Sequence, residues 1–274
     1  MNCIFVAKKP LFISSNAYLS QLKKRDKVKK AGFSGILDPF ACGTLIIAYG
    51  RYTRLFTFLD KNPKVYQATL WLGLESDTLD IEGIKKIHNI KRFKEERLES
   101  LLQSFCGKVS FIPPKYSAKK INGKKAYEIA RAGGNVVLKA QEMEVFKIEF
   151  LNYSHPFLSF KVWVSEGSYI RSLGELIARE LDCFGSLSYL ERLSEGGLVY
   201  QNEKKLNPLD ILPFPIIKCQ ENLKEAVFNG KRISKEDLKI YKEGKYIVKF
   251  EEFFSIILYQ EKNIEYLVNR ISLC

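Results

Sequence analysis

Histidine is scarce in this sequence, which has only His88 and His155 among 274 residues, and neither lies near another candidate ligand or nucleophile in the chain. Serine hydrolases and most zinc hydrolases use histidine as a catalytic base or as a metal ligand. The scarcity of histidine therefore argues against both classes of enzyme. The six cysteines form no C-x-x-C pair, which is typical of reduced thiols. We therefore expect no metal site.

Long apolar runs are missing as well. No segment approaches the roughly 20 apolar residues that span a bilayer, and the apolar run in the first ten residues, MNCIFVAKKP, is too short for a signal peptide. These absences predict a cytoplasmic protein that is not associated with a membrane. Positive charge is abundant, since 44 Lys and Arg against 31 Asp and Glu give a net charge of +13. This excess favours a polyanionic partner, although many basic proteins bind no nucleic acid.

The apolar residues follow both helical and strand-like patterns, which predicts an α+β fold. Helical spacing occurs over 16–29, 94–105 and 170–181, and strand-like runs occur over 44–49, 65–74, 145–150 and 158–164. Prolines at 208, 213 and 215 indicate a linker near 207–215. Beyond it, the segments YIVKF and FFSIILY predict a small β-rich C-terminal unit.

One short stretch, AGFSGILDPFACGTL, holds a single carboxylate among glycines, small residues and aliphatics. Asp-Pro starts many turns, so Asp38 has a simple interpretation as a loop cap. The stretch also lies between a basic helix and a hydrophobic strand, a position where scaffolds often present catalytic groups. The local residues alone leave both interpretations open.

Taken with other motifs, this stretch resembles the TruB family of tRNA pseudouridine synthases, whose catalytic loop reads G-H-x-G-x-L-D-P-x-A-x-G-x-L. Further matches follow in the family's order. They are KKP near Lys9, KVYQATLWLG, SDTLDIEG, PPKYSAKKINGKKAYEIAR and SEGSYIRSL. Together they cover about two-thirds of the chain, from Lys9 to Leu193. An ordered set of this kind is a strong signal.

The resemblance implies conversion of uridine 55 in the T-loop of tRNA to pseudouridine, without a cofactor. It places the catalytic aspartate at Asp38, a tyrosine that stacks on the target base at Tyr66, and the ion-pair partner of the aspartate at Arg171. Tyr169 and Lys9 match two further family positions. The implied fold is a mixed, largely antiparallel sheet with flanking helices, acting as a monomer on the T-arm.

Chemical reasoning on these residues agrees with the assignment. Isomerising uridine requires breaking its N1 glycosidic bond, turning the base and joining C5 to the sugar, and an ionised carboxylate can serve as the nucleophile. Burial would neutralise Asp38 unless a guanidinium paired with it. An arginine at a helix start gains nothing from the helix dipole, which favours a specific anionic partner for Arg171. The target base must also be flipped out of the folded T-loop.

The sequence departs from the family pattern at two places. Phe33 stands where the family has the histidine of G-H-x-G, which is thought to fill the space that the flipped base leaves. Phenylalanine can stack there but cannot titrate or donate a hydrogen bond. In addition, KKPLFISSN lacks the glycine that the family often places after the proline, which puts the loop around Lys9 in doubt.

We expect residues 1–213 to form the catalytic domain, with an RNA-contacting insertion over about 115–140, and residues 214–274 to form a short C-terminal domain similar to the PUA module. Four lysines of the insertion are expected to meet phosphates: Lys119, Lys120, Lys124 and Lys125. Asp80 lies in an acidic run that lacks the spacing of a calcium loop, and we expect it in the active-site wall, organising basic groups. A catalytically silent tRNA-binding or tRNA-folding module on the same scaffold is the alternative function.

Overall fold

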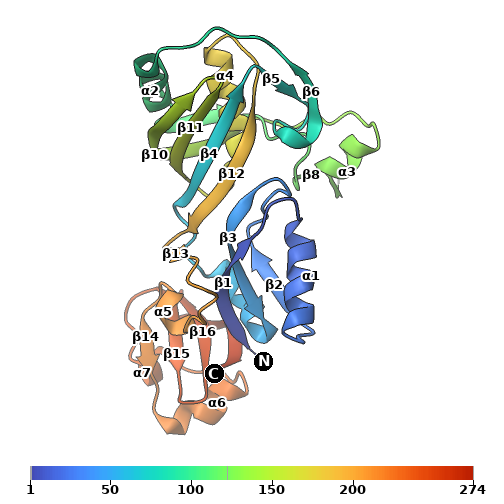
Figure 1. Ribbon diagram of the computed structural model, residues 1–274. Helices are drawn as coiled ribbons and strands as arrows, with labels where there is room; N and C mark the ends of the chain where they lie inside the picture. The colour runs from blue at the N-terminus through green and yellow to red at the C-terminus, as the bar shows by residue number, and fades with distance from the viewer. Residues whose placement is uncertain (1, 122, 274) are drawn as a thin grey trace.

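A nine-stranded sheet forms the main body of the computed structural model, which describes residues 2–121 and 123–273. The main path of the sheet runs β1 (Cys3–Lys9), β3 (Cys42–Tyr49), β12 (Gly185–Glu195), β4 (Lys64–Leu72), β11 (Phe157–Val164), β10 (Gln141–Ser154) and β7 (Gly107–Phe111). Two short strands extend it, β2 (Ala31–Ser34) beside β3 and β13 (Leu198–Val199) beside β12. Figure 1 shows this sheet running from the upper part of the molecule to its middle.

The strand directions confirm the mixed, largely antiparallel sheet. Among the described strands of this sheet, every pair is antiparallel except β3 with β12. That parallel pair has only two register positions, Glu191 opposite Cys42 and Arg192 opposite Gly43. It joins the N-terminal strands, drawn in blue in Figure 1, to the rest of the sheet. The seam between β3 and β12 is therefore short.

Two amphipathic helices cover one face of the upper sheet. Leu98 and Leu102 of α2 (Glu95–Ser104), with Leu173 and Ile177 of α4 (Ile170–Glu180), are fully buried in one cluster with strand side chains. Both helices lie close to their expected ranges. The N-terminal helix α1 (Ser15–Arg25) is shorter than expected, because the chain turns at Lys27, whose φ is 53°.

The hairpin expected near residues 145–164 is present, but its first strand is longer than the sequence pattern suggested. β10 covers fourteen residues, and its register against β11 shifts at Val145/Lys147 and at Phe150/Asn152. Each bulge inserts a residue and interrupts the alternation of apolar and polar side chains. The periodic pattern was therefore visible only between the two irregularities.

The remaining elements of the first 200 residues are short. The chain after β3 forms the 3₁₀ helix η1 (Gly50–Thr57). The acidic segment forms β5 (Leu74–Ser76), η2 (Ile81–Gly83) and β6 (Ile84–Ile87). The insertion after β7 forms β8 (Lys120–Ile121), β9 (Lys124–Lys125) and α3 (Ala126–Arg131). In Figure 1 this insertion projects from the upper body at the level where β3 ends.

The C-terminal unit is a four-stranded sheet that shares a core with the N-terminal strands. Its strands are β14 (Ile216–Lys218), β15 (Gly244–Lys249), β16 (Phe253–Gln260) and β17 (Asn263–Ser272). Short helices accompany them: α5 (Pro208–Ile211), η3 (Glu221–Leu223), α6 (Lys224–Phe228) and α7 (Lys235–Leu238). Phe254 and Ile256 are buried in one cluster with Ile4 and Ile46 of β1 and β3. The C-terminal sheet thus packs directly against β1 and β3.

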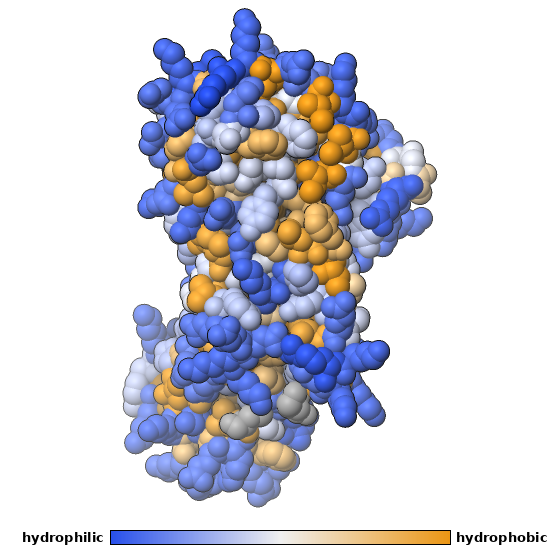
Figure 2. Space-filling view, viewed as in Figure 1, coloured by the Kyte–Doolittle hydropathy of each residue, from blue (hydrophilic) through white to orange (hydrophobic). Residues whose placement is uncertain are grey.

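The surface in Figure 2 is mostly hydrophilic, with hydrophobic residues gathered along the upper half near β5, β6 and β8. Ile84 and Ile87 of β6 are among the exposed apolar side chains. Within the described residues, no helix has the length and apolar character that crossing a membrane requires.

Candidate active site

Asp38 lies in a pocket of about 280 Å³ at the seam between the two parts of the sheet. The loop over 35–38 forms one wall, and β4, β12 and the start of α4 form the others. Ser117 and Ala118 of the insertion close one side. The pocket therefore brings together segments that are far apart in the sequence.

The loop that carries Asp38 is held in place by backbone geometry and by hydrogen bonds. The hydroxyl of buried Ser15 donates to the Leu37 carbonyl and accepts from the Leu37 N–H, both at 2.9 Å. Gly35 has a φ of 65°, and a Cβ there would lie about 3.0 Å from Arg192 Nη1. Only glycine meets both conditions without strain. The loop is thus fixed at both sides of Ile36.

Arg171 connects Asp38 to the acidic segment and to the insertion. Its Nη2 lies 2.9 Å from Asp38 Oδ2, and its Nη1 lies 3.3 Å from Asp80 Oδ2. It also donates to the carbonyls of Thr78, at 2.7 Å, and Tyr116, at 3.0 Å. Because the Arg171 side chain is only 3% exposed, the guanidinium is held rigidly. The expected pair of Asp38 and Arg171 is present.

The Asp38 carboxylate faces opposing influences. Desolvation in the pocket raises its pKa, the guanidinium of Arg171 lowers it, and the negative charge of Asp80 raises it again. The side chain itself remains 32% exposed, so a ligand in the pocket can reach it. The net result is a pKa of Asp38 that lies above the ordinary value of an aspartate, with the Arg171 guanidinium opposing the effect of burial.

Two tyrosines line the same pocket. Tyr66 projects from β4, where it lies opposite Arg192 of β12 and Val162 of β11, and it is largely buried. Tyr169 precedes the first turn of α4, and burial raises the pKa of its hydroxyl. Each supplies an aromatic ring to the wall of the pocket. Asp38, Tyr66, Tyr169 and Arg171 are therefore brought together.

A buried charged cluster at the same pocket was not expected from the sequence. Glu195 is fully buried and accepts a hydrogen bond from Ser34 at 2.8 Å. Its carboxylate lies 3.6 Å from Lys64 Nζ and 3.4 Å from Arg192 Nη2. Lys64 and Arg192 line the pocket, so they give it positive charge. Their separation in the sequence hid this arrangement, and no local motif marked it.

Lys9, which matches a family position, lies beside the loop that carries Asp38, and its expected contact with substrate stays a prediction. It is fully buried, and its ammonium donates to the carbonyls of Ile13, Pro10 and Pro39, at 2.6, 2.8 and 3.4 Å. Burial lowers the pKa of Lys9 to about 8. The residue ties the loop over 10–13 to the residue that follows Asp38.

Asp80 acts on the site through its ion pair with Arg171. Its side chain is almost completely buried and accepts hydrogen bonds from the Thr78 hydroxyl and from the Glu82 N–H, besides its pair with Arg171. This arrangement is compatible with the expected role of Asp80 in organising basic groups, and direct contact of Asp80 with a substrate stays a prediction. Asp80 positions the guanidinium that faces Asp38.

Replacing Asp80 by Asn should move the acid limb of the activity profile to lower pH. The Asp80 charge raises the pKa of Asp38, so its removal lowers that pKa and leaves Asp38 ionised at lower pH. The measurement is kcat/KM against pH. Asp77→Asn, in the same segment, is the matched control because Asp77 is exposed and pairs with Lys85. An acid limb that does not move in Asp80→Asn would contradict the electrostatic effect of Asp80 on Asp38.

The remaining expected residues lie outside the Asp38 pocket. Phe33 belongs to β2 and packs toward the cluster of Phe5, Leu22 and Ile47, whereas the next residue, Ser34, points to Glu195. The structure therefore does not bring Phe33 into the pocket. The four lysines of the insertion, at 119, 120, 124 and 125, are partly or fully exposed beside the pocket wall at 117–118.

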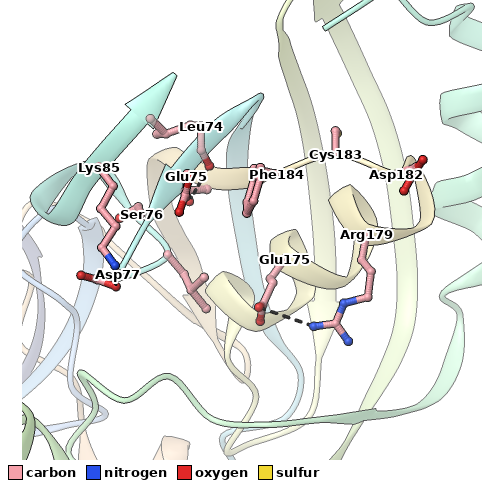
Figure 3. A pocket seen from close by; sticks show the side chains of 13 residues that line it. Leu74, Glu75, Ser76, Asp77, Lys85, Glu175, Arg179, Asp182, Cys183 and Phe184 are labelled. Carbon is pink, nitrogen blue, oxygen red and sulfur yellow. Dashed lines mark hydrogen bonds and ion pairs between the residues drawn. The ribbon is translucent and has the colours of Figure 1, made fainter. Parts of the chain in front are cut away.

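A larger pocket of about 530 Å³ lies on the other side of the acidic segment, between β5 and α4, and is shown in Figure 3. Four of its charged side chains form two pairs, Lys85 with Asp77 at 2.6 Å and Arg179 with Glu175 at 3.5 Å. Its lining residues do not include Asp38 or Arg171. Across residues 2–121 and 123–273, no group of three His, Cys, Asp or Glu side chains could hold a metal ion.

Solved structures establish the class of fold. A chain of the structure titled "Crystal Structure of a Cbf5-Nop10-Gar1 Complex" matches 99% of this chain with a TM-score of 0.70, over 84% of its own length, at 18% identity. A chain of "Crystal structure of the archaeal box H/ACA sRNP Nop10-Cbf5 complex" matches the same share with a TM-score of 0.65, at 17% identity and 85% of its length. At these identities the likeness defines the architecture alone.

Sequence relatives identify the family. The model described as TruB family pseudouridylate synthase (N terminal domain) matches residues 23–170. Proteins named tRNA pseudouridine synthase B are 50% identical in a Nitratiruptor species, over 99% of this chain and 98% of theirs, and 50% identical in Campylobacter jejuni, over the full length of both. This chain belongs to the TruB family of pseudouridylate synthases.

Proposed function

We propose that this protein isomerises uridine 55 in the T-loop of tRNA to pseudouridine, with Asp38 as the nucleophile. Pseudouridine formation in tRNA follows from the family and from the names of its full-length relatives. The observation that carries the finer proposal is the 2.9 Å pair of Asp38 with a buried guanidinium in a pocket of nucleotide size.

The chemistry needs no group from outside the substrate. Asp38 attacks C1′ or C6 of the nucleotide, the N1–C1′ bond breaks, and the base turns. C5 then bonds to C1′, and the bond from the Asp38 oxygen to C1′ or C6 breaks, which releases the carboxylate. The C5 proton then leaves, and N1 acquires a proton, so product and substrate are isomers. In this proposal the Tyr66 ring, which lines the pocket, is the surface on which the freed base stays while it turns, and the Tyr66 hydroxyl relays the C5 proton.

The rigid site also explains how the acid stays reactive. Because Arg171 has three further partners besides Asp38, it does not follow the carboxylate when the substrate enters. Preorganised charge of this kind stabilises a developing charge without reorganisation during the reaction. Lys64 of β4 and Arg192 of β12 add positive charge beside Gly35, and we propose that a phosphate of the flipped nucleotide lies near them.

The stacking role that the family resemblance gives Phe33 stays a prediction. Its partly exposed ring lies on β2, outside the pocket, at the N-terminal side of the loop that carries Asp38. The space that a flipped base leaves is in the RNA and outside the enzyme pocket, so this placement is compatible with the role.

Replacing the four insertion lysines by Gln should weaken tRNA binding and flatten its salt dependence. Each lost phosphate contact lowers the slope of log K against log salt by about 1. The set is Lys119, Lys120, Lys124 and Lys125. A matched control removes four exposed lysines near α2, β7 and β10: Lys91, Lys94, Lys108 and Lys147. Equal slopes for the two quadruple variants would contradict an RNA-contacting insertion.

The direct test of the proposed function uses an unmodified tRNA transcript and carbodiimide mapping of pseudouridine. We expect a single new modification at position 55 with the wild-type protein and none with a transcript in which that uridine is replaced by cytidine. Modification at another uridine would keep the enzyme class and overturn the assigned position. Tight tRNA binding without any pseudouridine would favour a silent tRNA-binding module.

A further inference from the structure

Phe12 combines an unfavourable backbone conformation with an exposed apolar ring. Its φ is 60°, in the left-handed region that residues with a Cβ disfavour. Its side chain is 69% exposed, and it belongs to none of the described core clusters. The fold therefore gains little from an aromatic ring at this position. Residues held in such conformations gather at functional sites.

The loop that carries Phe12 is fixed to the catalytic loop. The Phe12 N–H donates to the Pro39 carbonyl at 2.7 Å, so its backbone lies one hydrogen bond from the residue after Asp38. The buried ammonium of Lys9 binds Pro10, Ile13 and Pro39 in the same place. A ring that stands on so rigid a support loses little conformational entropy when it binds.

The loop to which Phe12 is hydrogen-bonded also carries an exposed apolar side chain. Ile36, which lines the Asp38 pocket, is 58% exposed, so the rim of the pocket near the catalytic loop is apolar. The pocket has room for one nucleotide, and the nucleotides that flank the target must then cross this rim. With the net charge of +13, an apolar aromatic surface beside a basic site is the arrangement that binds unpaired nucleic acid.

We propose that Phe12 stacks on a base that flanks the target uridine and so helps to hold the RNA in its opened form. This inference rests on the proposed function. Phe12 makes no contact with the reacting atoms, so it is a substrate-binding residue that acts on affinity. Stacking on an aromatic ring is worth about 1–3 kcal/mol per base, which corresponds to about 5- to 150-fold in Kd.

The test compares Phe12→Gly, Phe12→Ala and Phe12→Trp on a T-arm stem-loop RNA. Phe12→Gly relieves the backbone, so its melting temperature should rise by about 2–4 °C while Kd and KM rise about ten-fold. Phe12→Ala should weaken binding equally, Phe12→Trp should restore it, and kcat at saturating RNA should stay within about two-fold. Leu11→Ala, at the neighbouring exposed residue, is the matched control and should leave Kd unchanged.

A spectroscopic measurement separates stacking from a structural effect. With 2-aminopurine on either side of the target uridine, one of the two RNAs should lose fluorescence on binding to the wild type and keep it with Phe12→Ala. Unchanged Kd in Phe12→Gly, or lower kcat at unchanged Kd, would overturn the proposal. The same reactions also report whether pseudouridine forms. If the wild type forms none, the proposed function is overturned, and this outcome is distinct from a failure of the Phe12 proposal.

Discussion

Asp38→Asn is expected to reduce pseudouridine formation by at least about 10⁴-fold while the protein stays folded and binds tRNA. The amide cannot act as an anionic nucleophile, and removal of a nucleophile in other enzymes has effects of this size. The measurement is single-turnover conversion of a tRNA transcript with enzyme in excess, which separates the chemical step from product release.

The structure indicates why folding should survive this change. Asn has nearly the shape of Asp and keeps one oxygen to accept from Arg171. The guanidinium also retains Asp80, the Thr78 carbonyl and the Tyr116 carbonyl. Desolvation raises the pKa of Asp38, so the folded state disfavours its charged form, and a neutral side chain should not lower the melting temperature. Activity within ten-fold of the wild type would exclude Asp38 as the nucleophile.

Deleting residues 214–274 is expected to abolish cooperative folding of the rest of the chain. The deletion removes five buried side chains that pack on β1 and β3: Ile247, Phe254, Ile256, Val268 and Ile271. Burial of each such side chain contributes about 1.5–3 kcal/mol, so their loss is comparable to the whole free energy of unfolding of an ordinary domain. The measurement is thermal unfolding by circular dichroism, together with limited proteolysis.

Point variants of the full chain make this prediction sharper. Phe254→Ala should lower the melting temperature markedly, because truncation of a buried Phe costs about 3–5 kcal/mol. Tyr241→Ala changes an exposed aromatic residue of the same unit and should leave the melting temperature unchanged. A deletion variant that melts cooperatively within about 5 °C of the full chain would show that the two sheets fold independently.

The sequence was most informative where chemistry and local pattern coincide. The ordered motifs identified Asp38, Tyr66 and Arg171, and the structure places all three around one pocket. The helices of the upper sheet were also found, because α2 and α4 each bury a regular apolar stripe. The observed ends of both helices lie within one residue of the expected ends.

The sequence was least informative about polar groups that turn inward. A lysine next to a proline near the N-terminus resembles a surface cation, and only the three carbonyls around Lys9 reveal that it is buried. The cluster of Lys64, Arg192 and Glu195 depends on the pairing of β4 with β12, which no short motif encodes. Long-range strand pairing therefore decides which charges become neighbours.

The position of the seam between β3 and β12 has a consequence for synthesis of the protein on the ribosome. Asp38 precedes the seam in the chain, whereas Arg171 and Arg192 come after more than a hundred further residues. A nascent chain that has emerged only as far as α3 carries the carboxylate without its guanidinium partner. The enzyme therefore becomes competent late in translation, and premature termination before β12 yields fragments that have no assembled centre.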